Sequence, residues 1–288
     1  MIRSIRNFLS LIKFSHTVFA LPFALIGFSL GLQSGKGGFS WEKLIFVTLC
    51  MVFARSAAMA FNRLIDRRFD AKNPRTQQRE IPAGVISAHA ALTLVILSSL
   101  AFVLCAYFLN ALCFYLSPVA LLVILGYSFT KRFTALCHLV LGLGLALAPI
   151  GAYIAVTEEF ALLPILFSVL VFFWVSGFDI IYALQDDEFD KSQELKSIPV
   201  YLGRTNALRL SEVFHVLVVC MVVLAYVSGT FGWMYLMGAV FFTALLIYQH
   251  RLVKPNDLSK VTLAFGTTNG VASVVFCVFV CGDIFLLH

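Results

Sequence analysis

Residues 43–70 read KLIFVTLCMVFARSAAMAFNRLIDRRFD, an apolar run that passes without a break into a row of polar side chains. The apolar part is long enough to cross a bilayer, because a hydrocarbon core of about 30 Å needs about 20 such residues in a helix. Asn62, Asp66 and Asp70 recur every four residues, so they lie within about 80° of one another on a helix. The stretch therefore predicts one helix that runs from membrane depth into water and ends in an acidic face.

The composition of the whole chain is that of an integral membrane protein. Of 288 residues, 60% are hydrophobic and only 12% are charged, whereas soluble domains carry about 25% charged residues. A disordered chain is excluded, because this much apolar surface has to be buried. The seven cysteines form no CxxC pair and no zinc-type cluster with histidine, so we interpret them as small packing residues.

Apolar runs of membrane-spanning length predict nine transmembrane helices. They lie near residues 14–32, 43–64, 88–109, 112–130, 135–156, 160–184, 207–228, 232–249 and 262–287. The runs are continuously apolar rather than alternating, which favours helices over a barrel. The predicted fold class is all-α integral membrane, with a single transmembrane domain over residues 1–288.

The positions of the basic residues predict the orientation. Of the 21 Lys and Arg, all except Lys36, Lys43 and Arg55 fall on one side of the nine spans. The positive-inside rule places that side, with the N-terminus, in the cytoplasm and the C-terminus outside. In a bacterium this is the inner membrane. The expected partner is the lipid bilayer, and no nucleic acid is expected despite the net charge of +6.

Charge concentrates in two segments on the cytoplasmic side, with acidic loops near 62–87 and 185–206. The second segment places Asp179, Tyr182, Asp186 and Asp190 at offsets of 0, 3, 7 and 11. On a helix these side chains would again lie within about 80° of one another. Two such rows on the same side predict one shared polar site at the cytoplasmic mouth of a helical bundle.

Two acidic rows of this kind suit a metal-bound diphosphate. Carboxylates that lie close together repel one another unless cations sit between them, and Mg²⁺ prefers carboxylate oxygens. Metal and bases together would stabilise the charge on a departing diphosphate. The bases nearest to the rows are Arg67, Arg75, Arg79, Lys131, Arg132, Lys191 and Lys196.

Other interpretations remain open on these residues alone. Either row by itself is explained by a solvated helix end. Acids and an Arg within spans are equally typical of an ion-coupled carrier. Arg55 would bind either a substrate carboxylate or one of the chain's own Asp residues. His16 and His138, at predicted helix ends, are interpreted as polar packing residues.

Three segments carry a resemblance to a known family. The first is 55–70 with its continuation Asn73-Pro-Arg75 to Gly84, the second is 179–190 with Lys196-Ser-Ile-Pro199, and the third is Gly126-Tyr127-Ser-Phe-Thr-Lys131-Arg132-Phe133. They resemble the aspartate motifs and a third motif of the UbiA superfamily of intramembrane aromatic prenyltransferases, in particular its 4-hydroxybenzoate polyprenyltransferase-like branch. The resemblance covers nearly the whole chain, and that family also has nine helices.

The resemblance implies Mg²⁺-dependent transfer of a polyprenyl chain from a polyprenyl diphosphate to a hydroxylated aromatic acid in ubiquinone or menaquinone synthesis. Residue by residue, it implies three groups of site residues. Catalysis would use Asp66, Asp70, Asp179, Asp186 and Asp190, with metal held by Asn62, Asp66, Asp70, Asp186 and Asp190. Diphosphate would bind Arg75, Arg79 and Lys131, and the aromatic substrate would bind Arg55, Asn62 and Tyr127.

Two points stay open within the resemblance. Many members have Asn-Asp where this chain has Asn62-Arg63, a variant similar to the branch labelled 4-hydroxybenzoate polyprenyltransferase. The resemblance implies a second acceptor, 1,4-dihydroxy-6-naphthoate, because some of that branch serve the futalosine menaquinone route. The sequence does not decide between 4-hydroxybenzoate and 1,4-dihydroxy-6-naphthoate as the acceptor, and no feature of it indicates a tetrapyrrole acceptor. The run Asp186-Asp187-Glu188 also leaves open which of the first two acids binds metal.

Overall fold

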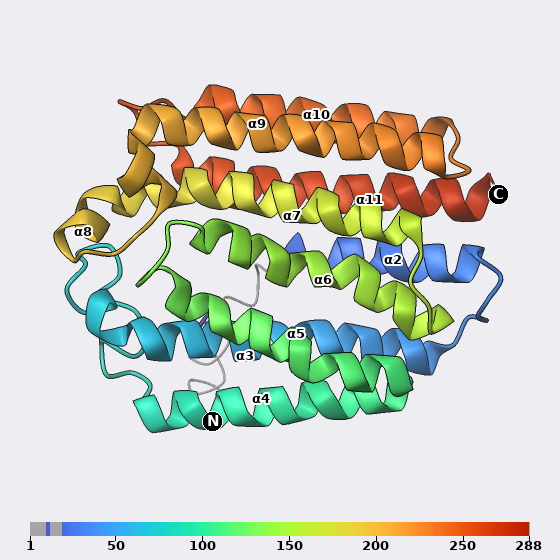
Figure 1. Ribbon diagram of the computed structural model, residues 1–288, viewed down its shortest axis with the longest axis horizontal. Coiled ribbons are helices and arrows are strands. Elements are labelled where there is room, and N and C mark those ends of the chain that lie inside the picture. Colours follow the sequence, from blue (N-terminus) through green and yellow to red (C-terminus); the bar gives the residue numbers. More distant parts are fainter. Residues whose placement is uncertain (1–9, 12–18, 288) are drawn as a thin grey trace.

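In a computed structural model, the chain forms a bundle of long helices that run back and forth between two ends (Figure 1). The structure describes residues 10–11 and 19–287. The helices are α2 (Leu21–Gln33), α3 (Trp41–Asp70), α4 (Ala88–Leu109), α5 (Ala111–Thr130), α6 (Cys137–Thr157), α7 (Leu162–Ala183), η2 (Leu184–Asp186), α8 (Asp187–Ser192), α9 (Ile198–Ser228), α10 (Trp233–Leu252), η3 (Leu263–Thr268) and α11 (Asn269–Leu286). Across the described residues there is no β-sheet, which confirms the all-α prediction.

The predicted spans correspond to these helices. In the part of the chain that the structure describes, eight helices are long and apolar enough to cross a membrane, and α2 is a shorter apolar helix of 13 residues. Residues 14–18 of the first predicted span, together with Arg3, Arg6, Lys13 and His16, lie outside the described residues. Helix α3 runs on to Asp70, so the first acidic row does lie on a single helix.

The second acidic row departs from the prediction of one continuous helical face. Helix α7 ends at Ala183, a 3₁₀ turn carries Leu184–Asp186, and α8 then leads away from the bundle end (Figure 1). Helix α9 begins nine residues before the predicted span of 207–228, because Ser197 caps it and Pro199 fits its first turn. It bends at Gly203, whose φ of +75° favours glycine.

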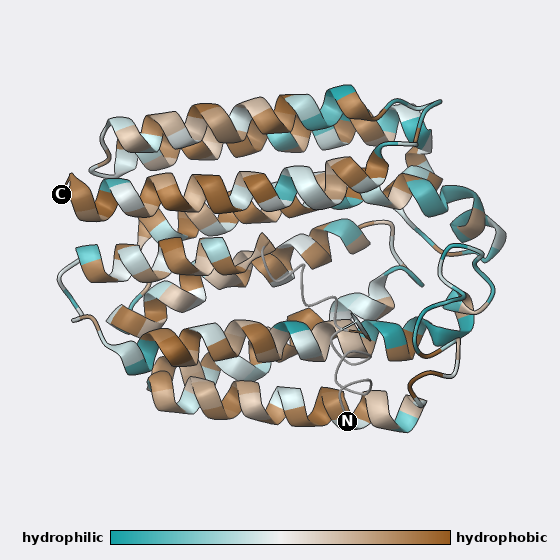
Figure 2. Ribbon diagram, turned by 180° about the vertical axis from the view of Figure 1, so that it is seen from behind, coloured by the Kyte–Doolittle hydropathy of each residue, from teal (hydrophilic) through white to brown (hydrophobic). Residues whose placement is uncertain are grey.

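Polar residues gather at one end of the bundle, around α8, the 71–87 segment and the α5–α6 junction (Figure 2). The C-terminal end of α11 lies at the opposite end (Figure 1). Between the ends, an aromatic core joins helices that are distant in sequence. Phe23 of α2 lies 5.2 Å from Trp174 of α7, and Phe242 of α10 stacks on Phe276 of α11 at 4.9 Å between ring centroids. This core fixes the helices that carry the polar end.

Helix α2 approaches α6 closely at Gly27. A Cβ atom added there would lie 2.0 Å from the carbonyl oxygen of Pro149, whereas one added at Gly151, two residues beyond Pro149 on α6, would meet nothing within 4 Å. Small residues at such crossings allow the backbones of membrane helices to pack against each other.

We therefore expect Gly27→Ala to destabilise the bundle by about 1–3 kcal/mol through overpacking. Gly151→Ala is the matched control and is expected to leave the thermal unfolding midpoint in detergent at or above that of the wild-type protein. Equal midpoints for the two variants would contradict this account of the α2–α6 contact.

Candidate active site at the polar end of the bundle

The predicted site residues line one cavity at the polar end, with a volume of about 290 Å³. The set comprises Arg55, Asn62, Asp66, Asp70, Arg75, Arg79, Tyr127, Lys131, Asp179, Asp186 and Asp190. They come from α3, the segment after it, α5 and its junction with α6, α7, the 3₁₀ turn and α8. Residues that are more than 100 positions apart in sequence are thus brought to one place by the fold.

Four of the five carboxylates in the two rows, all except Asp179, pair with an Arg or a Lys. The pairs are Asp66 with Arg132 at 3.0 Å, Asp70 with Arg79 at 2.7 Å, Asp186 with Arg75, and Asp190 with Lys131 at 2.6 Å. Asp70, Asp186 and Asp190 are buried. Buried carboxylates need such partners, because an unpaired charge away from water is costly.

The segment after α3 orients the pair at Asp186. Asn73 is buried and its side-chain amide donates to Asp186 Oδ1 at 2.9 Å, while its own oxygen accepts the backbone N–H of Arg75 at 2.9 Å. Arg75 Nε donates to the same Asp186 oxygen at 2.8 Å, and its Nη1 donates to the hydroxyl of Tyr182 at 3.0 Å. The guanidinium therefore binds the carboxylate with two nitrogens and is fixed in direction.

Lys131 is held at the end of α5 by its neighbours. Its carbonyl oxygen accepts the backbone N–H of Lys196 at 2.7 Å, which ties the α5–α6 junction to the segment after α8. Burial opposes the charge of Lys131, but the charge and hydrogen bond of Asp190 outweigh it and raise the pKa of the amine above its ordinary value. Lys131 therefore stays cationic at neutral pH.

Arg55 differs from Arg75, Arg79, Lys131 and Arg132 because it has no anionic partner, a property that it shares with Arg63 among the described bases of the cavity wall. Within the described residues its side chain makes no ion pair and no hydrogen bond, and its Nε atom is buried. The possibility of a salt bridge to one of the chain's own Asp residues is therefore not realised in this structure. Arg63 also lines the polar cavity and is only 4% exposed.

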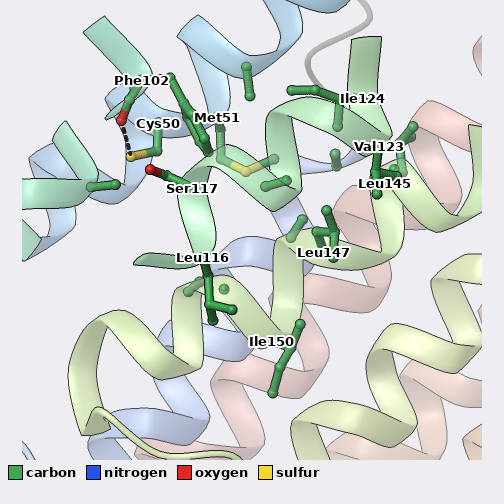
Figure 3. Close-up of a pocket in the computed structure, with 18 of the residues that line it drawn as sticks. Cys50, Met51, Phe102, Leu116, Ser117, Val123, Ile124, Leu145, Leu147 and Ile150 are labelled. Carbon is green, nitrogen blue, oxygen red and sulfur yellow. Dashed lines mark hydrogen bonds between the residues drawn. The ribbon is translucent and has the colours of Figure 1, made fainter. Parts of the chain in front are cut away.

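A second, apolar cavity of about 340 Å³ adjoins the polar one between α3, α4, α5 and α6. The two share Arg55, Met59, Tyr127, Leu141 and Leu145 in their walls. Figure 3 shows apolar side chains such as Leu116, Ile124 and Ile150 around it. Two of its polar groups bind backbone carbonyl oxygens, since the Cys50 thiol donates to Phe102 O and the Ser117 hydroxyl donates to Phe114 O.

The sequence did not predict some residues of the cavity wall, and some bases expected near the acidic rows lie outside it. Asn73, His138 and Phe265 line the polar cavity but were not predicted as site residues. Asn73 had a signal, because it precedes Arg75 in the first motif, whereas Phe265 belongs to the π-helical turn η3 and had none. Three of the bases near the acidic rows, Arg67, Lys191 and Lys196, do not line the cavity.

Asp186 and Asp187, the two candidates for the metal-binding acid, have different surroundings. Asp186 lines the cavity, whereas Asp187 is bound by Arg204 of α9 through two nitrogens, at 2.6 and 2.8 Å, and is not part of the cavity wall.

The polar cavity offers oxygen donors for a metal ion. Among residues 10–11 and 19–287, no three His, Cys, Asp or Glu side chains converge closely enough to hold an ion, because the bases lie between the acids. One oxygen is nevertheless unsatisfied, since the buried Asp70 Oδ2 accepts no hydrogen bond. A set of carboxylate and amide oxygens with such an orphan fits a hard cation such as Mg²⁺.

These features together define a class of protein. A multi-pass helical bundle with a buried acid-and-base cavity that adjoins an apolar cavity suits an amphiphile with an anionic head. Comparisons with known proteins agree. Residues 20–279 match the model of the UbiA prenyltransferase family. The chain belongs to this family and is a prenyltransferase rather than an ion-coupled carrier.

Similar proteins have related names. The chain is 32% identical over 241 residues to a 4-hydroxybenzoate octaprenyltransferase of Aliivibrio fischeri (strain ATCC 700601 / ES114), with 82% of each chain covered. It is 27% identical over 235 residues to the protein of that name from Francisella tularensis subsp. mediasiatica (strain FSC147), again with 82% of each covered.

Solved structures are similar over nearly the whole chain. An apo UbiA homologue from Aeropyrum pernix K1 has a TM-score of 0.80 at 29% identity, covering 94% of this chain and 97% of that one. A UbiA homologue from Archaeoglobus fulgidus, solved with GPP and Mg²⁺ bound, has a TM-score of 0.77 at 20% identity, covering 96% and 99%. The second likeness shows the fold alone.

The different partners of the adjacent acids generate a prediction. We expect Asp186→Asn to lower Mg²⁺-dependent prenyl transfer by about 100-fold or more, because it removes a charge from the reacting site. Asp187→Asn is the matched control and should stay within about threefold of wild type, since its pair with Arg204 is a partly exposed surface contact. Both are measured in detergent-solubilised membranes. The reverse order would assign the metal to Asp187.

Proposed function

We propose that this protein transfers a polyprenyl chain from a polyprenyl diphosphate to a hydroxylated aromatic acid of the 4-hydroxybenzoate type, in quinone biosynthesis. The observation that carries the proposal is that the acid-and-base cavity adjoins an apolar cavity and shares Arg55 and Tyr127 with it. A polyprenyl diphosphate has the same division, with a polar head and a long apolar chain. The names of the similar proteins support this choice.

The metal would be held by Asn62, Asp66, Asp70, Asp186 and Asp190. The amide of Asn62 donates to Asp66 Oδ2 at 3.0 Å, so its carbonyl oxygen is left for a cation. The chemistry that bound Mg²⁺ supplies is stabilisation of the charge on the departing diphosphate. The Mg²⁺ bound to the Archaeoglobus fulgidus homologue supports a divalent metal in this fold.

The bases would change partners when the substrate binds. Arg75, Arg79 and Lys131 each neutralise a carboxylate in the structure. With the carboxylates holding metal, the same three side chains would be left to bind the diphosphate oxygens. Arginine suits this task because its fork binds two phosphate oxygens at once. The diphosphate would then be held on several sides as its bond to the prenyl carbon breaks.

The apolar cavity would hold the prenyl chain, and its shared wall would hold the aromatic acid. Tyr127 stands at the boundary, where the allylic end of the chain and the aromatic ring have to meet. Arg55 has no anion of its own and suits the carboxylate of the acceptor. An acceptor such as 1,4-dihydroxy-6-naphthoate carries the same carboxylate and hydroxyl groups, so it is the second candidate.

The orientation follows from the distribution of basic residues. We infer that the polar end faces the cytoplasm of a bacterium and that the chain, as one domain over 1–288, lies in the inner membrane. A cytoplasmic opening gives a water-soluble aromatic acid access to the site, while the prenyl substrate reaches it from the bilayer.

The direct test uses detergent-solubilised membranes with Mg²⁺ and a long-chain polyprenyl diphosphate. 4-Hydroxybenzoate and 1,4-dihydroxy-6-naphthoate are offered separately, and prenylated product is identified by mass. We expect product with 4-hydroxybenzoate and none with Asp66→Asn or without Mg²⁺. Product with the naphthoate alone would move the acceptor to the second candidate, and product with neither would contradict the proposal.

The role of Arg55 is tested by removing each side of the contact in turn. Arg55→Leu is expected to lower kcat/KM for 4-hydroxybenzoate about 10- to 100-fold, the effect of losing hydrogen bonds to a charged group. With phenol, which lacks the carboxylate, wild type and Arg55→Leu are expected to be equally slow. A further loss with phenol in Arg55→Leu would show that Arg55 acts on something other than the carboxylate.

A further inference from the structure

His138 and Asp179 form a buried pair in the wall of the polar cavity. His138, the second residue of α6, is 3% exposed, and its Nδ1 lies 2.7 Å from Asp179 Oδ2 on α7. The two helices lie side by side (Figure 1). Both residues line the polar cavity, yet neither takes part in the four pairs between acids and bases. The residues proposed to bind metal and diphosphate therefore do not include this pair.

The neighbours of the imidazole determine where its proton lies. The backbone N–H of Ile198 donates to His138 Nε2 at 3.4 Å. A backbone N–H can only donate, so Nε2 presents its lone pair and the ring proton is on Nδ1. His138 therefore donates that proton to Asp179, which is held as the acceptor. The pair is a carboxylate oriented by an imidazole N–H.

Close packing of α6 on α7 holds the pair in place. A Cβ atom added at Gly142, one turn after His138, would lie 2.3 Å from the hydroxyl oxygen of Ser176 and 2.6 Å from the carbonyl oxygen of Phe172. The Ser176 hydroxyl itself lies 3.3 Å from the His138 carbonyl oxygen. The backbone of His138 is thus fixed against the helix that carries Asp179.

Asp179 differs from the other acids of the cavity. Among the described residues it pairs with no Lys or Arg, its Oδ1 has no hydrogen-bond partner, and its side chain is 21% exposed. Lys and Arg hold a carboxylate in its ionised form, whereas an imidazole N–H on one oxygen leaves the other oxygen for a ligand. Nearby, the thiol of Cys137 donates to the backbone oxygens of Ala135 and Lys196, and Asp190 is paired with Lys131. Neither group therefore binds the second oxygen of Asp179.

We propose that Asp179, oriented by His138, accepts the hydroxyl proton of the aromatic acceptor during prenyl transfer. The inference rests on the proposed function, since it needs a phenolic substrate in the cavity. Asp179 would be the catalytic residue that touches the substrate, and His138 would be a positioning residue that acts through it. Withdrawal of the phenolic proton feeds electrons into the ring and makes its carbon a better nucleophile.

Atoms and electrons balance over the transfer. The ring carbon next to the hydroxyl forms a C–C bond to C1 of the prenyl chain, while the C1–O bond breaks and its electron pair leaves with the diphosphate. The phenolic proton passes to Asp179 Oδ1, which gives a neutral dienone. The ring carbon then loses its hydrogen to water as a proton, and the oxygen recovers a proton from Asp179. One diphosphate and one proton leave for each product.

The experiment measures kcat and KM for both substrates over a range of pH. Asp179→Asn is expected to lower kcat about 10²- to 10⁴-fold near neutral pH, the usual share of a general base. It should regain activity as the pH approaches the pKa of a phenol, which is about 10 for tyrosine, because a phenolate no longer needs an acceptor. KM for the prenyl diphosphate should not change.

His138 is tested with two variants and a control. His138→Leu should lower kcat about 10- to 100-fold, as expected for loss of a hydrogen bond to a charged group. His138→Gln retains an N–H donor and should recover part of that loss. His215→Leu is the matched control, since His215 is equally buried but lies on α9, bonded to His250 and to Trp174 O. It should keep the wild-type pH profile.

A pH profile of Asp179→Asn parallel to that of wild type would overturn the inference, and so would equal kcat losses in His138→Leu and His215→Leu. Because Asp179→Asn keeps the size of the side chain, it decides the question even where His138→Leu does not fold. Wild-type protein that prenylates neither hydroxyaryl acid would instead contradict the proposed function.

Discussion

The pairing of four acids with four bases at one end of a membrane bundle is the interaction on which the rest of the site depends. A buried carboxylate without a counter-charge would be costly, so the chain has to bring bases to Asp66, Asp70, Asp186 and Asp190 from other segments. Helix α5 ends where Lys131 reaches Asp190, and the segment after α3 turns so that Arg75 reaches Asp186. The segments at the polar end are therefore held together by these four pairs.

The same pairing gives the site a way to accept a highly charged ligand. In the structure the four acids are neutralised by four bases. Under the proposed function, divalent cations bound to the acids would leave the bases to bind an anionic diphosphate, so that charge would stay balanced throughout. The apolar cavity next to Arg55 and Tyr127 would then bury the prenyl chain of the substrate away from water. The bilayer supplies the same division between a polar end and an apolar middle.

Much of this arrangement was predictable, because helical spacing and hydropathy are local. The recurrence of Asn62, Asp66 and Asp70 every four residues predicted their common helical face, and α3 confirms it by running on to Asp70. The partner of each acid was not predictable, since it depends on where the α5–α6 junction folds back. The 3₁₀ turn at Leu184–Asp186 was also not predicted, because the spacing of the acids fits an unbroken helix equally well. His138 was interpreted as a packing residue because its neighbour Asp179 is 41 positions away and the sequence has no signal that joins them.

The central claim, an exchange of partners between acids and bases, is tested most directly by a structure of this protein with Mg²⁺ and an unreactive prenyl thiodiphosphate. The account predicts metal bound by oxygens of Asp66, Asp70, Asp186 and Asp190, with Arg75, Arg79 and Lys131 moved onto the diphosphate and the prenyl chain in the apolar cavity. A structure in which the four pairs between acids and bases remain intact while the diphosphate binds elsewhere would contradict it.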